Sequence, residues 1–138
     1  MKLKYLKNNI QIFEKKITVS AEDLDARNHV NNVRYVQWVQ DIAEENWIDN
    51  TSTTIRDTYY WVMLSHHIHY KAEAILGDDL LLKTFVTKAE GLRSTRIVEI
   101  YNKNTTKLLS SSETIWCLMS HETNKPSRIT QEIIDLFQ

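Results

Sequence analysis

The chain has 138 residues, a usual length for one domain with its own hydrophobic core. Its 17 basic and 18 acidic residues give a formal net charge of −1, so the composition indicates neither a nucleic-acid partner nor an anionic membrane surface. No apolar run approaches the ~18 residues of a membrane span, and no apolar core follows the basic residues 1–7, as in a signal peptide. One cysteine cannot form an intrachain disulfide. We therefore expect a single cytoplasmic domain over residues 1–138.

The first predicted strand covers residues 10–20, where β-branched residues partly alternate with polar ones. A polar loop follows, and it contains Asp23, Asp25 and His29. A carboxylate before a helix can attack a substrate or activate water, or it can only cap the helix and complement its dipole. Both roles stay open for Asp25, whereas Asp23 is expected to stabilise the loop. His29 could orient Asp25, contact a substrate carbonyl, transfer protons near neutral pH, or tie the loop to the backbone.

The strongest helix pattern extends from Asn32 to Ile48, roughly 25 Å at about 1.5 Å per residue. Asn31 or Asn32 is the predicted N-cap, because its side-chain oxygen can accept from the first-turn amides. The predicted apolar stripe consists of Val33, Val36, Val39 and Ala43, widened by Tyr35, Trp38, Ile42 and Trp47. We expect the fold to wrap around this helix. The helix N-terminus would favour negative charge that develops beside it.

The remaining chain predicts a surface loop over residues 49–57, four strands and a short terminal helix. The strands are expected at 59–71, 80–89, 94–102 and 108–119, and the helix at 131–137. Short connections favour an antiparallel meander, since parallel neighbours need a crossover of about a dozen residues or more. One long helix with one antiparallel sheet predicts the α+β class.

Three histidines, His66, His67 and His69, lie in one predicted strand and raise the question of a metal site. At most two of them can point to the same face, and no acid or cysteine accompanies them at ligand spacing. No metal or other cofactor is therefore expected. Cys117 is expected in the core, because free cysteines are usually buried and no base for a nucleophile is recognisable nearby.

The segment Asp23–Tyr35 has the pattern Asp-x-Asp-x-x-x-His-Val-Asn-Asn-x-x-Tyr. Together with the order of elements and a second segment, Tyr70–Leu80, it resembles the hotdog-fold thioesterases. The similarity is to the 4-hydroxybenzoyl-CoA thioesterase-like branch and the related acyl-ACP thioesterases, and it covers essentially the whole chain. The resemblance implies a five-stranded antiparallel sheet wrapped around one long central helix. It also implies a homodimer or a dimer of dimers with active sites at the subunit interface.

The resemblance further implies the site residues. Asp25 matches the catalytic carboxylate of the hydroxybenzoyl-CoA branch, and the helix-start amide that polarises the thioester carbonyl falls near Asn32. In the acyl-ACP branch, Asp25 and His29 match, but the asparagine between them is replaced by Arg27. Glu73 matches a downstream acid of that branch on a looser alignment, with an ordinary strand-end charge as the alternative.

The implied function is hydrolysis of an acyl-CoA or acyl-ACP thioester, with Asp25 as nucleophile or general base. Lys88, Arg93 and Arg96 flank a predicted hairpin; they could meet a CoA phosphate or an acidic carrier-protein helix, but a solvated sheet edge is the simpler expectation. A hotdog hydratase or dehydratase is one alternative, although its histidine follows the aspartate by five residues, not four. A non-catalytic acyl-CoA-binding module is the other, although such proteins usually carry a DNA-binding segment and this chain has no basic patch.

Overall fold

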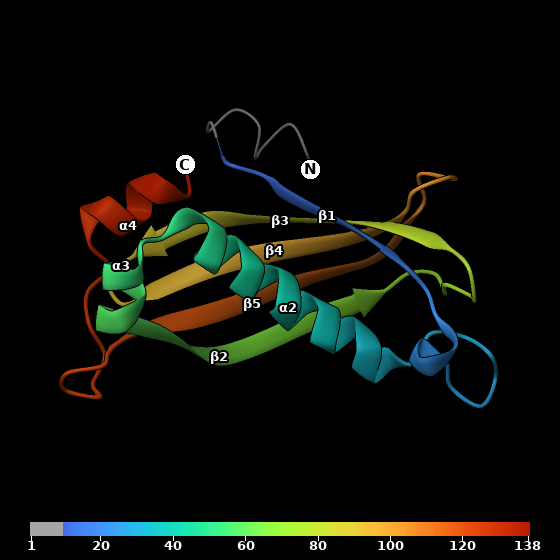
Figure 1. Cartoon of the computed structure of the whole chain (residues 1–138), viewed down its shortest axis with the longest axis horizontal. Helices are drawn as coiled ribbons and strands as arrows, with labels where there is room; N and C mark the ends of the chain where they lie inside the picture. Colours follow the sequence, from blue (N-terminus) through green and yellow to red (C-terminus); the bar gives the residue numbers. More distant parts are fainter. Residues whose placement is uncertain (1–9) are drawn as a thin grey trace.

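The computed structural model describes residues 10–138, so the N-terminal residues 1–7 discussed above lie outside the described range. The elements are β1 (Phe13–Thr18), η1 (Ala21–Asp23), α2 (Asn32–Asn50), α3 (Thr53–Thr58), β2 (Tyr59–Tyr70), β3 (Asp79–Glu90), β4 (Arg93–Asn102), β5 (Leu108–Ser120) and α4 (Gln131–Leu136). The long helix α2 lies across one face of the sheet, and α3 and α4 lie together at one end of the molecule (Figure 1). The predicted α+β class and hotdog architecture, with five antiparallel strands and one long helix, are confirmed.

The strands lie in the order β1-β3-β4-β5-β2, and all neighbours are antiparallel. The predicted meander is correct for β3, β4 and β5. It is wrong for β2, which pairs with β5 and forms one edge of the sheet. The reason is the connection 71–78, which crosses the end of the sheet and does not form a hairpin (Figure 1). This crossing brings Ala74 and Ile75 against the loop before α2.

Asn31 is the N-cap of α2, and its side chain accepts a hydrogen bond from the Val33 amide at 3.0 Å. The buried residues of the helix recur at three- and four-residue spacing; they are Tyr35, Trp38, Val39, Ile42, Ala43 and Asn46. The prediction that Val33 belongs to this stripe is wrong, because its side chain is 73% exposed. Val33 lies about 200° around the helix from Tyr35, at 3.6 residues per turn, and so faces away from the sheet.

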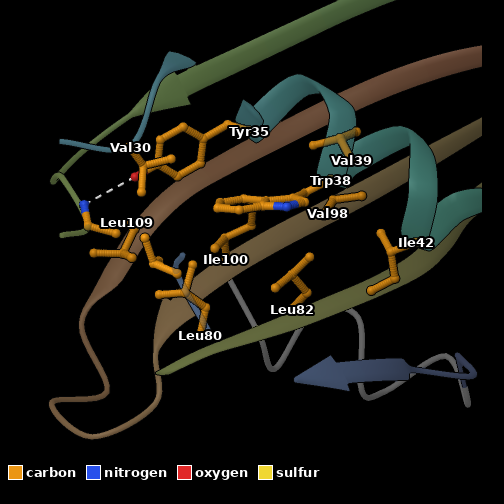
Figure 2. Close-up of a cluster of buried hydrophobic side chains, with 12 residues drawn as sticks. Val30, Tyr35, Trp38, Val39, Ile42, Leu80, Leu82, Val98, Ile100 and Leu109 are labelled. Carbon is orange, nitrogen blue, oxygen red and sulfur yellow. Dashed lines mark hydrogen bonds between the residues drawn. The ribbon is translucent and has the colours of Figure 1, made fainter. Parts of the chain in front are cut away.

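The main core lies between α2 and the sheet (Figure 2). In Figure 2 the helix contributes Tyr35, Trp38, Val39 and Ile42, and the strands contribute Leu80, Leu82, Val98, Ile100 and Leu109. Ile42, Leu80 and Ile100 have no exposed surface. Burial of a large aliphatic side chain stabilises the fold by about 1.5–3 kcal/mol, so this core fixes the rotation of α2 and, with it, the direction of the helix N-terminus.

The sequence predicts a surface loop over residues 49–57, but the end of α2 and the short helix α3 occupy most of that range. Ser52 begins α3, because its hydroxyl accepts from the Ile55 amide at 3.1 Å. The six residues of α3 include no buried one, so the helix has no apolar stripe that a sequence pattern could reveal. Within residues 10–138, no helix is both long enough and apolar enough to span a membrane.

Candidate active site

Asp25 lies in a tight loop between η1 and α2. Its Oδ1 accepts hydrogen bonds from the backbone amides of Arg27 at 2.8 Å and His29 at 3.2 Å. Asn28 makes the turn with φ of 62°, a left-handed conformation that asparagine tolerates better than most residues. Oδ2 of Asp25 has no hydrogen-bond partner within residues 10–138. One carboxylate oxygen therefore holds the loop, and the other is available to a substrate or to water.

The surroundings of Asp25 keep its carboxyl group ionised. Burial by itself would raise the pKa of Asp25, but the amides of His29 and Arg27 and the positive charge of Arg27 outweigh this effect. The pKa of Asp25 therefore lies below its ordinary value. The ionised form is the one that can attack a carbonyl carbon or take a proton from water.

Glu73, in the connection between β2 and β3, bridges Arg27 and His29. Its Oε1 lies 2.5 Å from Arg27 Nη2, and its Oε2 lies 3.5 Å from His29 Nε2, which is long for a hydrogen bond. The other ring nitrogen, His29 Nδ1, is enclosed and has no partner in the described part of the chain. The structure thus brings His29 and Glu73 together in one cluster. Arg27, at the position of the asparagine in the acyl-ACP branch, binds this acid. The catalytic roles of His29 and Glu73 stay predictions.

Asn32 provides the first amide of α2. The amide of Val33 is bonded to the Asn31 side chain, and the amide of Arg34 donates to the Asn31 carbonyl at 2.8 Å. The Asn32 amide has no acceptor among the described residues. It is therefore a free donor at the positive end of the helix dipole. A group that stabilises developing negative charge needs both properties.

Two tyrosines to which the sequence analysis gave no role at the site tie the segment after β2 to α2. The Ala74 amide donates to Tyr35 Oη at 3.2 Å (dashed line in Figure 2), and Tyr70 Oη donates to the Asn32 carbonyl at 3.4 Å. The Ala74 carbonyl accepts from the Val30 amide at 3.0 Å. Tyr35 closes the Asp23–Tyr35 pattern, so its place in the motif was the available signal; Tyr70 gave none beyond its position at the strand end.

Asp23 stabilises the loop, as predicted. Its carboxylate accepts from the Ser20 amide at 2.9 Å, from the Ser20 hydroxyl at 3.2 Å and from Arg34 Nε at 2.6 Å. Burial would raise the pKa of Asp23, but the bonds from Ser20 and Arg34 together lower it. Because Arg34 belongs to the first turn of α2, these contacts join the start of the loop to the start of the helix; we call Ser20, Asp23 and Arg34 the loop clamp.

Arg96 contradicts its prediction, because it is only 7% exposed and lies at no solvated edge. It shares a face of β4 with buried Val98 and Ile100, which explains its burial. Lys88 is exposed and pairs with Glu90 at 3.2 Å, and Arg93 is exposed. These two residues stay candidates for contact with a phosphate or an acidic carrier.

Cys117 is buried, as predicted. The Nε2 atoms of His67 and His69 lie 3.0 Å apart at the surface. Between residues 10 and 138, no group of three or more His, Cys, Asp or Glu side chains has an arrangement that could hold a metal ion.

A cavity of about 620 Å³ lies beside the C-terminal half of α2. None of Asp25, His29, Asn32 or Glu73 lines it. Trp47, which does line it, is fifteen residues from Asn32 along α2, or roughly 22 Å at 1.5 Å per residue. The predicted catalytic loop and this cavity therefore lie toward opposite ends of the helix.

The family model described as the thioesterase-like superfamily matches residues 19–137. A 1,4-dihydroxy-2-naphthoyl-CoA thioesterase from Synechocystis has a similar structure, with a TM-score of 0.80, 19% identity, and coverage of 92% of this chain and 96% of that chain. A protein from Staphylococcus aureus, solved in complex with CoA, gives a TM-score of 0.82, 20% identity and coverage of 92% and 82%.

A third similar structure is the 12:0-ACP thioesterase from Umbellularia californica, with a TM-score of 0.79 and 14% identity. That match covers 92% of this chain and 51% of the plant protein, so the chain corresponds to about half of it. A comparison with curated proteins finds no match. At these identities the solved structures establish the fold, and the family model establishes the family.

Proposed function

The chain belongs to the thioesterase-like superfamily, and we propose that it hydrolyses an acyl thioester to a free acid and a thiol. The observation that carries the proposal is the Asp25 carboxylate, which is ionised, fixed through Oδ1 and open at Oδ2. Similar proteins include a CoA thioesterase, a protein in complex with CoA and an ACP thioesterase. We therefore propose acyl-CoA or acyl-ACP thioesters as the substrates, with Lys88 and Arg93 as surface cations available to either thiol carrier.

In the proposed reaction the Asn32 amide donates to the thioester carbonyl oxygen and stabilises the oxyanion that forms there. If Asp25 is a general base, it takes a proton from water while the water oxygen attacks the carbonyl carbon. The tetrahedral intermediate then expels the thiolate, which is protonated to the thiol. If Asp25 is a nucleophile, its oxygen forms an anhydride with the acyl group, the thiolate leaves, and water hydrolyses the anhydride. Both routes require the negative charge of Asp25.

We also propose that the active form is a homodimer or a dimer of dimers. Strand β2 is a sheet edge of 12 residues, and Val62 and Leu64 on it are 40% and 49% exposed. A long edge with exposed apolar residues favours pairing with another strand. Pairing of two β2 edges would create an isologous interface.

The substitution Asp25→Asn tests the catalytic proposal. It keeps the size and an acceptor oxygen for the Arg27 and His29 amides, so the loop should keep its conformation, but it removes the charge. We expect turnover of a CoA or ACP thioester to fall about 10²–10⁴-fold as for loss of a general base, or at least as much for loss of a nucleophile. KM should change little, because the acyl chain and the thiol carrier supply most of the binding.

The matched control is Glu22→Gln, an exposed acid of η1 whose one side-chain hydrogen bond within residues 10–138 is the 3.4 Å bond from the Ser20 hydroxyl. Asp23→Asn is unsuitable as a control, because Asp23 belongs to the loop clamp. Unchanged turnover in Asp25→Asn would remove the catalytic assignment. If the unaltered protein bound acyl-CoA but hydrolysed no thioester, the non-catalytic binding module would be the better description.

A further inference from the structure

The cavity beside the C-terminal half of α2 is enclosed mainly by aromatic and aliphatic side chains. Its aromatic lining comes from α2, β2, β5 and the segment at α4; these residues are Trp47, Tyr59, Tyr60, Trp61, Trp116 and Phe137. Its volume of about 620 Å³ falls within the ~300–1,000 Å³ of small-molecule sites. Such sites combine an apolar lining with a few fixed polar groups that orient the ligand.

Three cationic side chains, Arg56, Lys88 and Arg96, belong to this lining, and Arg96 is the buried one. Its Nη1 donates to Asn46 Oδ1 at 2.9 Å and to Thr84 Oγ1 at 3.0 Å. Asn46 is itself 2% exposed and Thr84 is fully buried, so both acceptors are rigidly held. The Arg96 Cζ lies 5.7 Å from the ring centroid of Phe137. These contacts fix the orientation of the guanidinium and use the two hydrogens of Nη1.

Nε and Nη2 form the other edge of the guanidinium. An arginine has five N–H donors, and those on Nε and Nη2 of Arg96 have no acceptor within residues 10–138. In the described chain, the polar side-chain atoms that are both fully enclosed and unpartnered are His29 Nδ1 and His66 Nε2. Because Arg96 Nε and Nη2 are not among these atoms, they keep some accessible surface. The Nε and Nη2 edge is the one that binds a carboxylate through two parallel hydrogen bonds.

No anion in the described chain balances the charge of Arg96. The ion pairs of residues 10–138 do not include it, and the one carboxylate side chain among the described lining residues, Glu44, is exposed. Burial lowers the pKa of Arg96 to about 10, so the guanidinium stays charged at neutral pH. A buried charge without a counter-ion is costly, and it is stabilised when an anion binds.

We infer that this cavity binds an apolar carboxylate, an aliphatic or aromatic carboxylic acid, with its carboxylate on the Nε and Nη2 edge of Arg96 and its hydrocarbon part among the aromatic side chains. The site lies apart from the Asp25 loop, and its occupancy does not depend on thioester hydrolysis. The ligand class follows from the pairing of one buried guanidinium with an apolar enclosure of this size.

Titration calorimetry at neutral pH tests the inference with two pairs of probes: decanoate with decanol, and hydrocinnamate with hydrocinnamyl alcohol. We expect at least one acid to bind once per chain and at least tenfold more tightly than its alcohol. The pair that binds more tightly distinguishes an aliphatic from an aromatic ligand. Asp25→Asn should keep this binding, because Asp25 does not line the cavity. Loss of turnover and loss of carboxylate binding are thus separable.

Arg96→Met should weaken binding of the acid at least tenfold and leave that of the alcohol within about threefold. The matched control is Arg128→Met, an exposed arginine outside the cavity lining, which should change neither. If circular dichroism shows that Arg96→Met does not fold, Ala89→Phe serves as the test variant, because its larger side chain narrows the cavity while Arg96 is kept. It should weaken the acid and the alcohol alike. Three results would overturn the inference. The unaltered protein could bind acid and alcohol equally, or bind neither acid at millimolar concentration. Folded Arg96→Met or Ala89→Phe could also bind the acid as tightly as the unaltered protein does.

Discussion

The loop clamp makes a quantitative prediction about stability. Asp23 accepts three hydrogen bonds, two from Ser20 and one from Arg34, and its side chain is 8% exposed. Asp23→Ala removes all three. A hydrogen bond to a charged group contributes about 1.5–3 kcal/mol, and a buried partner left unsatisfied costs about 1–3 kcal/mol. Ser20 is exposed, however, and Arg34 is 37% exposed, so water can solvate both after the substitution.

Because water can replace the lost partner, each hydrogen bond contributes a net stability of about 1 kcal/mol. The ion pair of Asp23 with the partly exposed Arg34 contributes less than a buried pair would. Asp23→Ala should therefore lower the free energy of unfolding by about 2–3 kcal/mol. At roughly 3 °C per kcal/mol for a chain of this length, Tm should fall by about 6–9 °C. The matched control Glu22→Ala, an exposed neighbour, should stay within about 0.5 kcal/mol.

Urea denaturation followed by circular dichroism measures the difference, with all variants at one protein concentration, because dimerisation would make stability concentration-dependent. The pH dependence gives an independent check. The pKa of Asp23 is lowered in the folded state, so its contribution is fully present above the unfolded value of about 3.9 and is lost as pH falls through the folded pKa. The gap between the unaltered protein and Asp23→Ala should therefore shrink in acid. A loss below about 0.5 kcal/mol at neutral pH would refute the role of the clamp.

Arg27→Asn restores the asparagine of the acyl-ACP branch and should leave turnover within a few-fold, because Asp25 and the helix amide are present without it; a tenfold gain on carrier-bound substrates would show that the acyl-ACP arrangement applies. Sedimentation at micromolar concentration should show at least a dimer, and a clean monomer of ~16 kDa would argue against a site completed at an interface.

The start of α2 was predictable because its signals are local. Asn31 needs only the amide two residues ahead to act as N-cap, and the spacing from Tyr35 to Asn46 follows the period of the helix itself. The loop-stabilising role of Asp23 was also predicted, whereas the catalytic role of Asp25 stays a prediction. The contacts that hold these two carboxylates were not predicted, since Asp23 is bonded to Arg34 and the Asp25 loop turns at Asn28.

Features that depend on distant contacts were missed. The pairing of β2 with β5 depends on the path of residues 71–78 across the sheet end. The turn residues Gly77 and Asp78 mark only the end of that path and do not specify the crossing. The contact of Glu73 with Arg27 depends on the same crossing. Arg96 had a usable signal, because it lies two residues before Val98 and four before Ile100, and strand alternation places it on the same face as these apolar residues. Its charge favoured an exposed position, and only Asn46 and Thr84 explain why it is tolerated inside.

The two ends of α2 carry opposite partial charges. An anion bound near the N-terminus and an anion bound near the C-terminus are therefore stabilised by different kinds of group. At the N-terminus the dipole and the open Asn32 amide already favour an oxyanion, so no side-chain cation is required. At the C-terminus the carbonyls of Ile48 and Thr51 repel an anion, and Arg56 Nη1 donates to both of them. Arg56 also lines the cavity, but its Nη1 is bonded to these carbonyls; a carboxylate in the cavity is therefore stabilised by the buried charge of Arg96 on β4. Because Asp25 does not line the cavity that contains Arg96, the double variant Asp25→Asn/Arg96→Met should combine the loss of turnover of the first substitution with the loss of carboxylate binding of the second.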